Sequence, residues 1–110
     1  TVTGTRPVDE YDDAFTGLQR STDQLATVRL TGPEGTGVAM SWDAASACVQ
    51  IHTADLPGGA AQAGHRAGLA VEPTTCAPDA FNQAAYSHDT GVIALEPGVP
   101  VEASWRITAL

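Results

Sequence analysis

Hydrophobic and polar residues alternate along much of this chain, which is the pattern of β-strands that bury one face. The alternation is clear in four ranges of the sequence: 26–31, 38–42, 47–53 and 101–108. Two further ranges, 68–71 and 92–95, are apolar throughout, and the first of them fits a strand that is covered on both faces. No stretch keeps a helical period over several turns. These six short strands predict an all-β fold, namely an antiparallel β-sandwich.

Turn-forming residues separate the predicted strands. Residues 32–37 read Gly-Pro-Glu-Gly-Thr-Gly, which is the composition of a hairpin loop. Residues 54–65 are rich in Gly, Ala and Pro and predict a flexible loop, and residues 73–90 look irregular. Residues 1–24 are polar, so we expect a loop there with at most a short strand or helical turn. Because strands of one pattern flank the loop at 54–65, the sequence predicts a single domain over residues 1–110.

The charge balance of the chain is strongly acidic. Five basic residues, all of them Arg, stand against 13 Asp and Glu residues, which gives a net charge of −8. Nucleic acids and anionic membranes bind clustered positive charge, so neither is expected as a partner. No apolar run is long enough to predict a membrane span, and no signal peptide is visible. We therefore expect a soluble, cytoplasmic protein that acts on a neutral ligand.

The two cysteines, Cys48 and Cys76, form neither a CxxC pair nor a dense disulfide framework. Free thiols that pack as small hydrophobic side chains in a reducing cytosol are the preferred interpretation, and a disulfide between them stays open. A zinc site is not expected, and no metal-ligand cluster or glycine-rich phosphate loop stands out. We expect neither a metal nor a cofactor.

Glu72 is the residue that the local sequence favours most for catalysis. It follows three apolar residues and precedes Pro73, which pushes the residue before it into extended geometry. The carboxylate is therefore expected at the end of a buried strand. Partial burial at such a position raises the pKa of a carboxyl group and makes it a better base near neutral pH. The alternative is a strand-end glutamate that is simply solvated.

Four blocks of the sequence together resemble one family. The block around Glu72 runs from Arg66 to Asn82 and contains Gly-Leu-Ala-Val-Glu-Pro followed by Pro-Asp-Ala-Phe-Asn. It resembles the segment around the catalytic glutamate of the aldose 1-epimerases, the galactose mutarotase-like family. The other blocks agree with the family in order and spacing: Tyr11–Phe15, Val49–Asp55, and Ile93–Gly98 with Trp105–Ile107. Residues 1–110 thus resemble the C-terminal portion of such a domain, which implies that they are part of the family's supersandwich fold.

The resemblance implies a function and roles for individual carboxylates. Enzymes of this family are isomerases that interconvert the α and β anomers of a free aldohexose, such as galactose or glucose, by acid–base ring opening without a metal or cofactor. Glu72 is expected to take the proton from the anomeric hydroxyl. Asp12 is expected to bind a ring hydroxyl, and Asp13 is the neighbouring candidate if the alignment shifts by one residue. The alternative for both aspartates is a solvated acidic loop.

The histidines depart from the family pattern. In the family, a histidine well upstream of the aspartate segment donates a proton to the ring oxygen, and a second histidine also lies upstream. None of His52, His65 and His88 matches those positions; we expect His52 to be a packing or rim residue and the other two to lie in loops. The acid is therefore expected in an N-terminal part of the same protein, and residues 1–110 alone are expected to have little or no mutarotase activity.

Two other functions remain open. One is a non-catalytic carbohydrate-binding β-sandwich. The other is a relative of the phosphosugar epimerases, which needs basic residues that the five scattered arginines hardly supply. Trp42 and Trp105 are possible stacking platforms for a sugar. Each lies in register with apolar neighbours on its strand, however, so core packing is expected for both.

Overall fold

The computed structural model describes residues 4–110, which form two three-stranded antiparallel sheets. In the first sheet, β4 (Cys48–His52) lies between β1 (Asp12–Phe15) and β5 (Ala70–Thr74). Pro73 belongs to β5. β5 is an edge strand and pairs on one side only, so it can accommodate a proline, which has no backbone N–H to donate.

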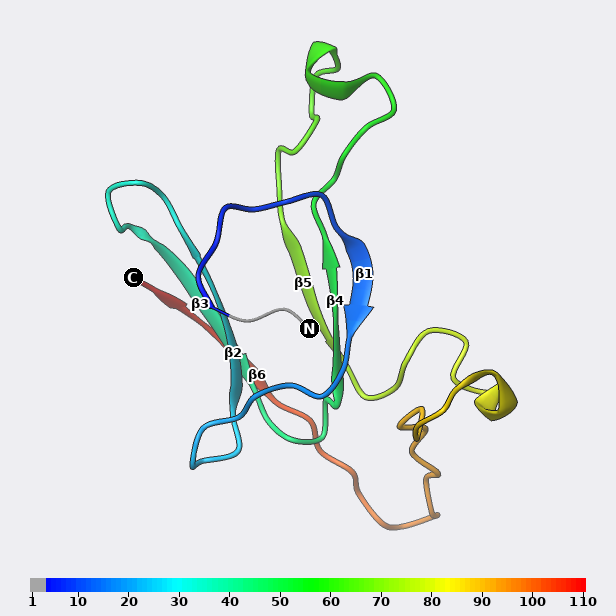
Figure 1. The fold of residues 1–110 in the computed structure, drawn as a ribbon. Helices are drawn as coiled ribbons and strands as arrows, with labels where there is room; N and C mark the ends of the chain where they lie inside the picture. Colours follow the sequence, from blue (N-terminus) through cyan, green and yellow to red (C-terminus); the bar gives the residue numbers. More distant parts are fainter. Residues whose placement is uncertain (1–3) are drawn as a thin grey trace.

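In the second sheet, β3 (Gly37–Trp42) lies between β2 (Ala26–Thr31) and β6 (Trp105–Ala109). Strands β2 and β3 are paired antiparallel and form the predicted hairpin. Figure 1 shows the two sheets on either side of the molecule, with long loops that carry the short 3₁₀ turns η1 (Gly59–Ala61) and η2 (Gln83–Ala85) extending away from them. The prediction of an all-β fold of antiparallel sheets packed as a sandwich is confirmed.

Three of the predicted strands match β2, β3 and β4 to within one residue at each end. Two other predicted strands have wrong boundaries. β6 begins at Trp105 rather than at residue 101, and β5 begins at Ala70 and continues through Glu72 to Thr74 instead of ending before Glu72. Pairing with β4 sets the limits of β5, since Glu72 lies opposite Gln50 in the ladder, whereas the sequence prediction followed apolar character alone.

The predicted strand at residues 92–95 is also wrong, because the described part of the chain has no strand there. Val92, Ile93 and Leu95 are exposed, Leu95 to 72%. An apolar run becomes a strand when a neighbouring strand offers backbone partners and a surface that covers the side chains. Residues 87–104 instead form an irregular segment that leads into β6 (Figure 1).

The hydrophobic core lies between the two sheets. Its buried centre combines Ala26 and Trp42 from the second sheet with Val49 and Ile51 from the first. Partly buried hydrophobic residues surround this centre: Tyr11, Phe15, Leu18, Val28, Met40, Leu69 and Val71. Trp42 is only 1% exposed, which confirms that it packs in the core. Its Nε1–H has no hydrogen-bond partner among the described residues.

Strand β6 is exposed along its whole length. Trp105 lies directly opposite Trp42 in the β3–β6 ladder, so both side chains are on the same face of the second sheet. Trp105 is nevertheless 65% exposed, and β6 contributes no residue to the core within residues 4–110. The prediction of core packing is therefore wrong for Trp105, because within residues 4–110 nothing covers the edge strand that carries it.

Two polar side chains fix loops at one end of the second sheet. Arg20 donates through Nη1 to the carbonyl oxygens of Gln24 at 3.1 Å and Asp43 at 2.9 Å, and through Nη2 to that of Ser46 at 2.7 Å. Asp43 Oδ2 accepts the N–H of Ser104 at 2.7 Å and its hydroxyl at 2.6 Å, which fixes the chain just before β6. These hydrogen bonds, chiefly the one from the Ser104 hydroxyl, lower the pKa of Asp43.

Candidate functional site

Glu72 lies on the face of the first sheet that points away from the core. Successive residues of a strand point to opposite faces, whereas directly paired residues point to the same face. Val71 is paired with Ile51, and both contribute to the core, so Glu72 points outward beside its partner Gln50. Gln50 is in turn paired with Ala14 of β1. One row across this outer face therefore consists of Ala14, Gln50 and Glu72.

The next row on the same outer face consists of Asp12, His52 and Ala70. Gln50 Nε2 donates to Oδ1 of Asp12 at 2.9 Å, and His52 Nδ1 lies 3.5 Å from the same oxygen. Three strands thus bring together four polar side chains, which we call the outer-face cluster: Asp12, Gln50, His52 and Glu72.

Asp13 lies on the opposite side of the first sheet. It is paired with Ile51, whose side chain is in the core, so Asp13 projects on the core side of the edge strand β1, where it is exposed. The sequence does not decide between the two aspartates. In the structure, Asp12 is the one that lies on the same face as Glu72.

The surroundings of Glu72 differ from those expected from the sequence. Glu72 is exposed and lies within β5 rather than at its end, so the partial burial that we expected is absent within residues 4–110. The sheet still holds its backbone, because Glu72 is paired with Gln50 and Pro73 keeps it extended. His52 is the diagonal neighbour of Glu72 on β4, a relation in which Cα atoms lie roughly 7–8 Å apart, within reach of long side chains.

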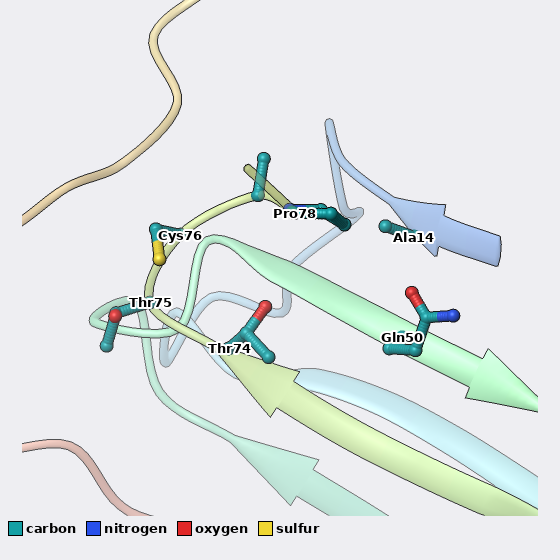
Figure 2. A pocket seen from close by; sticks show the side chains of 7 residues that line it. Ala14, Gln50, Thr74, Thr75, Cys76 and Pro78 are labelled. Atoms are coloured by element: carbon teal, nitrogen blue, oxygen red, sulfur yellow. The ribbon is translucent and has the colours of Figure 1, made fainter. Parts of the chain in front are cut away.

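A concavity of about 550 Å³ adjoins the outer-face cluster. It is lined by Ala14 of β1, Gln50 of β4 and residues 74–78, which form the end of β5 and the loop after it. Figure 2 shows the Gln50 side chain between the strand that carries Ala14 and the segment that carries Thr74 and Cys76. The volume is in the range of small-molecule sites. Gln50 is the member of the outer-face cluster that lines the concavity, so a ligand bound there would contact Gln50.

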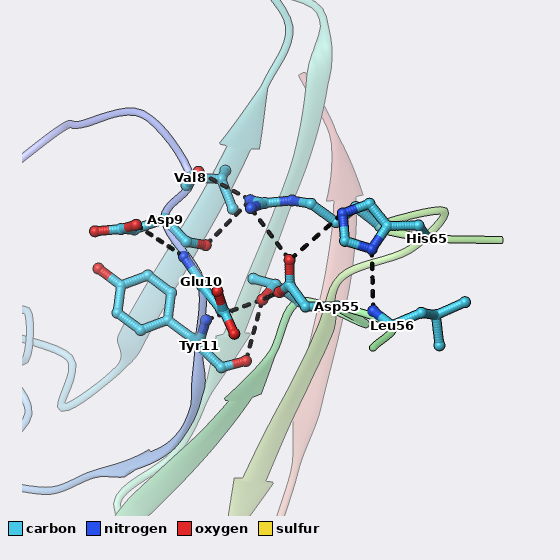
Figure 3. Close-up of polar contacts among 9 residues, drawn as sticks. Val8, Asp9, Glu10, Tyr11, Asp55, Leu56 and His65 are labelled. Atoms are coloured by element: carbon cyan, nitrogen blue, oxygen red, sulfur yellow. Dashed lines mark hydrogen bonds and ion pairs between the residues drawn. The ribbon is translucent and has the colours of Figure 1, made fainter. Parts of the chain in front are cut away.

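A second polar network lies beyond the end of β4 and has a structural role (Figure 3). Thr53 Oγ1 accepts the Tyr11 N–H at 2.9 Å and is hydrogen-bonded to the carboxylate of Asp55. Arg66 Nη1 lies 3.4 Å from Asp55 Oδ1, and its Nη2 donates to the carbonyl oxygens of residues 8–9 at 2.9 and 3.1 Å. Since these groups bind one another, the network attaches the loop after β4 to the segment before β1.

The three histidines have different surroundings. His65 belongs to the second network, where its Nδ1 accepts the Leu56 N–H at 3.0 Å. His88 lies in the loop after η2, with its ring edge-on to Tyr86. Both therefore lie in loops, as predicted, whereas His52 lies on β4 and joins the outer-face cluster.

The sequence interpretation gave no site role to Gln50 or His52. Alternation does place residues 50 and 52 on one face of a strand, opposite the core residues 49 and 51. It does not show which strands flank β4 or in what register, and the register is what brings Asp12 and Glu72 to the same face.

Residues 4–110 contain no group of three or more His, Cys, Asp or Glu side chains placed to hold a metal ion. Cys48, which is buried, and Cys76, which is half-buried, are free thiols. In the part of the chain that the structure describes, no helix is both long and apolar enough to cross a membrane. Comparisons with protein-family models, with curated proteins and with solved structures gave no match for this chain.

Proposed function

We propose that this chain is the C-terminal portion of an aldose 1-epimerase, a mutarotase that interconverts the α and β anomers of a free aldohexose such as galactose or glucose. One observation carries the proposal. Glu72 and Asp12, the two carboxylates that the family resemblance singles out, lie on one face of the first sheet, and Gln50 between them also lines a concavity large enough for a small molecule. A neutral sugar also agrees with the acidic charge balance of the chain.

The arrangement suits a cycle of proton transfers. The Glu72 carboxylate accepts the proton of the anomeric hydroxyl while an acid donates a proton to the ring oxygen, so that the C1–O5 bond breaks and an aldehyde forms. Rotation about the C1–C2 bond presents the other face of the carbonyl carbon. Reversal of both proton transfers then closes the ring as the other anomer. Asp12 binds a ring hydroxyl throughout and keeps the sugar oriented.

The acid in this proposal comes from an N-terminal part of the same protein, as the family resemblance implies. The two sheets are then a portion of the larger galactose mutarotase-like supersandwich. The exposed strand β6 supports this proposal, because the side chains of Trp105 and Ile107 offer an apolar surface that further strands of a sandwich can cover. The free thiols Cys48 and Cys76 support a reducing compartment, and we propose the cytoplasm.

The experiment that tests this function is Glu72→Gln in the protein that includes the N-terminal part. We expect anomer interconversion to fall by about 100-fold or more, since a general base contributes that much, while sugar binding is kept. Polarimetry of freshly dissolved α-D-galactose follows the reaction. Glu102→Gln, which changes an exposed glutamate just before β6, is the matched control and should leave turnover unchanged. Unchanged turnover in Glu72→Gln would remove Glu72 from the mechanism.

The same assay applies to the 110-residue chain by itself. We expect it to convert anomers no faster than the buffer blank, because Glu72 then works without its acid partner. Rapid conversion by this chain alone would show that the acid lies within it.

A non-catalytic sugar-binding β-sandwich is the second candidate, and the exposure of Glu72 favours it. In that case the protein with its N-terminal part binds free aldoses, but the wild type and Glu72→Gln both interconvert anomers at the blank rate. Turnover by the wild type therefore decides between the two functions.

A further inference from the structure

We propose that His52 is a positioning residue for Asp12, and that the two residues together bind a pair of neighbouring hydroxyl groups on the sugar while Glu72 acts at the anomeric carbon. The inference rests on the proposed function of the same site. It gives a role to a histidine for which the family resemblance supplies none.

The two oxygens of the Asp12 carboxylate have different surroundings. Oδ1 accepts a hydrogen bond from Gln50 Nε2 at 2.9 Å and faces His52 Nδ1 at 3.5 Å. Oδ2 has no hydrogen-bond partner among residues 4–110. Contacts from two side chains of β4 to one oxygen fix the orientation of the carboxylate, and the other oxygen is left to accept a hydroxyl from a ligand. The Asp12 side chain is 77% exposed, so a ligand can reach it.

His52 turns Nδ1 toward the Asp12 carboxylate, so Nε2 is the ring nitrogen that is left for a ligand. The His52 side chain is 46% exposed. Asp12 and His52 are directly paired, so their Cβ atoms lie roughly 4.5–5.5 Å apart on the outer face. Their polar ends also lie side by side, with Nδ1 of His52 3.5 Å from Oδ1 of Asp12, and such a pair suits the hydroxyls of adjacent ring carbons.

The strand order separates this pair from the carboxylate that acts as base. β4 lies between β1, which carries Asp12, and β5, which carries Glu72. Two interstrand spacings correspond to roughly 9–10 Å, which is comparable to the width of a hexose with its substituents. A sugar laid across β4 can therefore present its anomeric hydroxyl to Glu72 and hydroxyls from the other side of its ring to Asp12 and His52.

Three substitutions at His52, made in the protein that includes the N-terminal part, test whether this histidine positions Asp12 or has another role. Asn places its side-chain amide near the position of Nδ1, Gln places its amide near the position of Nε2, and Ala supplies neither. We expect His52→Ala to raise KM for galactose about three- to tenfold, the effect of one lost hydrogen bond, with little change in kcat. Asn should restore KM better than Gln because it keeps the contact with Asp12. His88→Ala, in an exposed loop, is the control and should change neither constant.

Binding of 1,5-anhydro-D-glucitol provides a second measurement, by NMR titration of the 110-residue chain and of the longer protein. This sugar analogue has the ring hydroxyls but no anomeric hydroxyl, so it cannot react. His52→Ala should weaken its binding about three- to tenfold, and Glu72→Gln should leave it unchanged. Thermal unfolding of each variant checks that the exposed substitutions leave the fold intact.

The outcomes distinguish the two proposals. If Glu72→Gln abolishes turnover while His52→Ala changes neither KM nor analogue binding, the role of His52 is wrong and the proposed function stands. A fall in kcat with unchanged KM in both the Ala and Asn variants would make His52 a proton donor and overturn positioning. If the wild type does not interconvert anomers, the proposed function fails, and weaker analogue binding by His52→Ala still supports the pair.

Discussion

Arg20 attaches the irregular segment between β1 and β2 to the residues that follow β3 at one end of the second sheet. The guanidinium donates to three carbonyl oxygens, those of Gln24, Asp43 and Ser46. The bonds to Asp43 and Ser46 are partly buried, and the bond to Gln24 is exposed. Arg20→Ala therefore leaves two partly buried carbonyl groups without their donor.

The expected loss follows from the two partly buried bonds. A hydrogen bond that involves a charged group contributes roughly 1.5–3 kcal/mol, and partial exposure favours the lower end of that range. Two such bonds give a loss of roughly 3 kcal/mol in the free energy of unfolding for Arg20→Ala, with little added by the exposed bond. Lys carries a single ammonium group in place of the planar fork, so Arg20→Lys should recover less than half of this loss.

Urea unfolding at pH 7, followed by tryptophan fluorescence, measures the loss, because the buried Trp42 changes its surroundings when the core opens. Arg29→Ala is the matched control: Arg29 is exposed on β2, and its removal should change the free energy by less than about 0.5 kcal/mol. Equal urea midpoints for Arg20→Ala and Arg29→Ala would show that the hydrogen bonds from Arg20 to the carbonyl groups do not hold the segment between β1 and β2. Full rescue by Lys would contradict the geometric argument.

Two further predictions concern Asp43 and Gly37. The lowered pKa of Asp43 stabilises the fold above the ordinary carboxyl value of about 4, and this stabilisation is lost as pH falls through the lowered value. The urea midpoint of the wild type should thus exceed that of Asp43→Asn at pH 7 and converge with it by about pH 2; a gap that does not change with pH would contradict this. A Cβ on Gly37 would lie 2.0 Å from the Leu30 carbonyl oxygen, so Gly37→Ala should cost about 1–3 kcal/mol in the same assay. Gly68→Ala, where nothing lies within 4 Å of an added Cβ, should be close to neutral, and equal effects at the two glycines would refute the steric argument.

The hairpin of β2 and β3 shows what alternation can predict. Its apolar positions face one way and its loop has the composition of a turn, and the predicted strand ends agree with the structure to within one residue because all of this information is local. The two tryptophans show the limit. Trp42 and Trp105 have the same alternating neighbours and lie opposite each other, yet one is 1% and the other 65% exposed. Burial depends on what lies over each strand, which is a property of the packing of the whole sandwich.

The candidate site was predictable only in part, for a similar reason. Glu72 and Asp12 follow from a family resemblance, and the rule for the residue before proline correctly gives Glu72 an extended backbone. The partial burial expected for Glu72 was wrong because apolar neighbours in sequence point to the other face of a strand. Gln50 and His52 could not be assigned at all, since their role depends on the partners of β4 in the ladder.

Packing on the core face of β1, opposite the candidate site, determines whether Asp12 or Asp13 lies on the same face as Glu72. Phe15 of β1 is paired with Val49 and packs against the core, which sets the register of β1 along β4. A slip of one residue would turn Asp13 toward Glu72 and at the same time move Phe15 to the outer face. Burial of a phenylalanine contributes about 1.5–3 kcal/mol, and the lower value for a partly buried ring still favours the observed register by about tenfold. An apolar side chain that never meets a ligand thus determines which carboxylate joins Glu72 on the outer face.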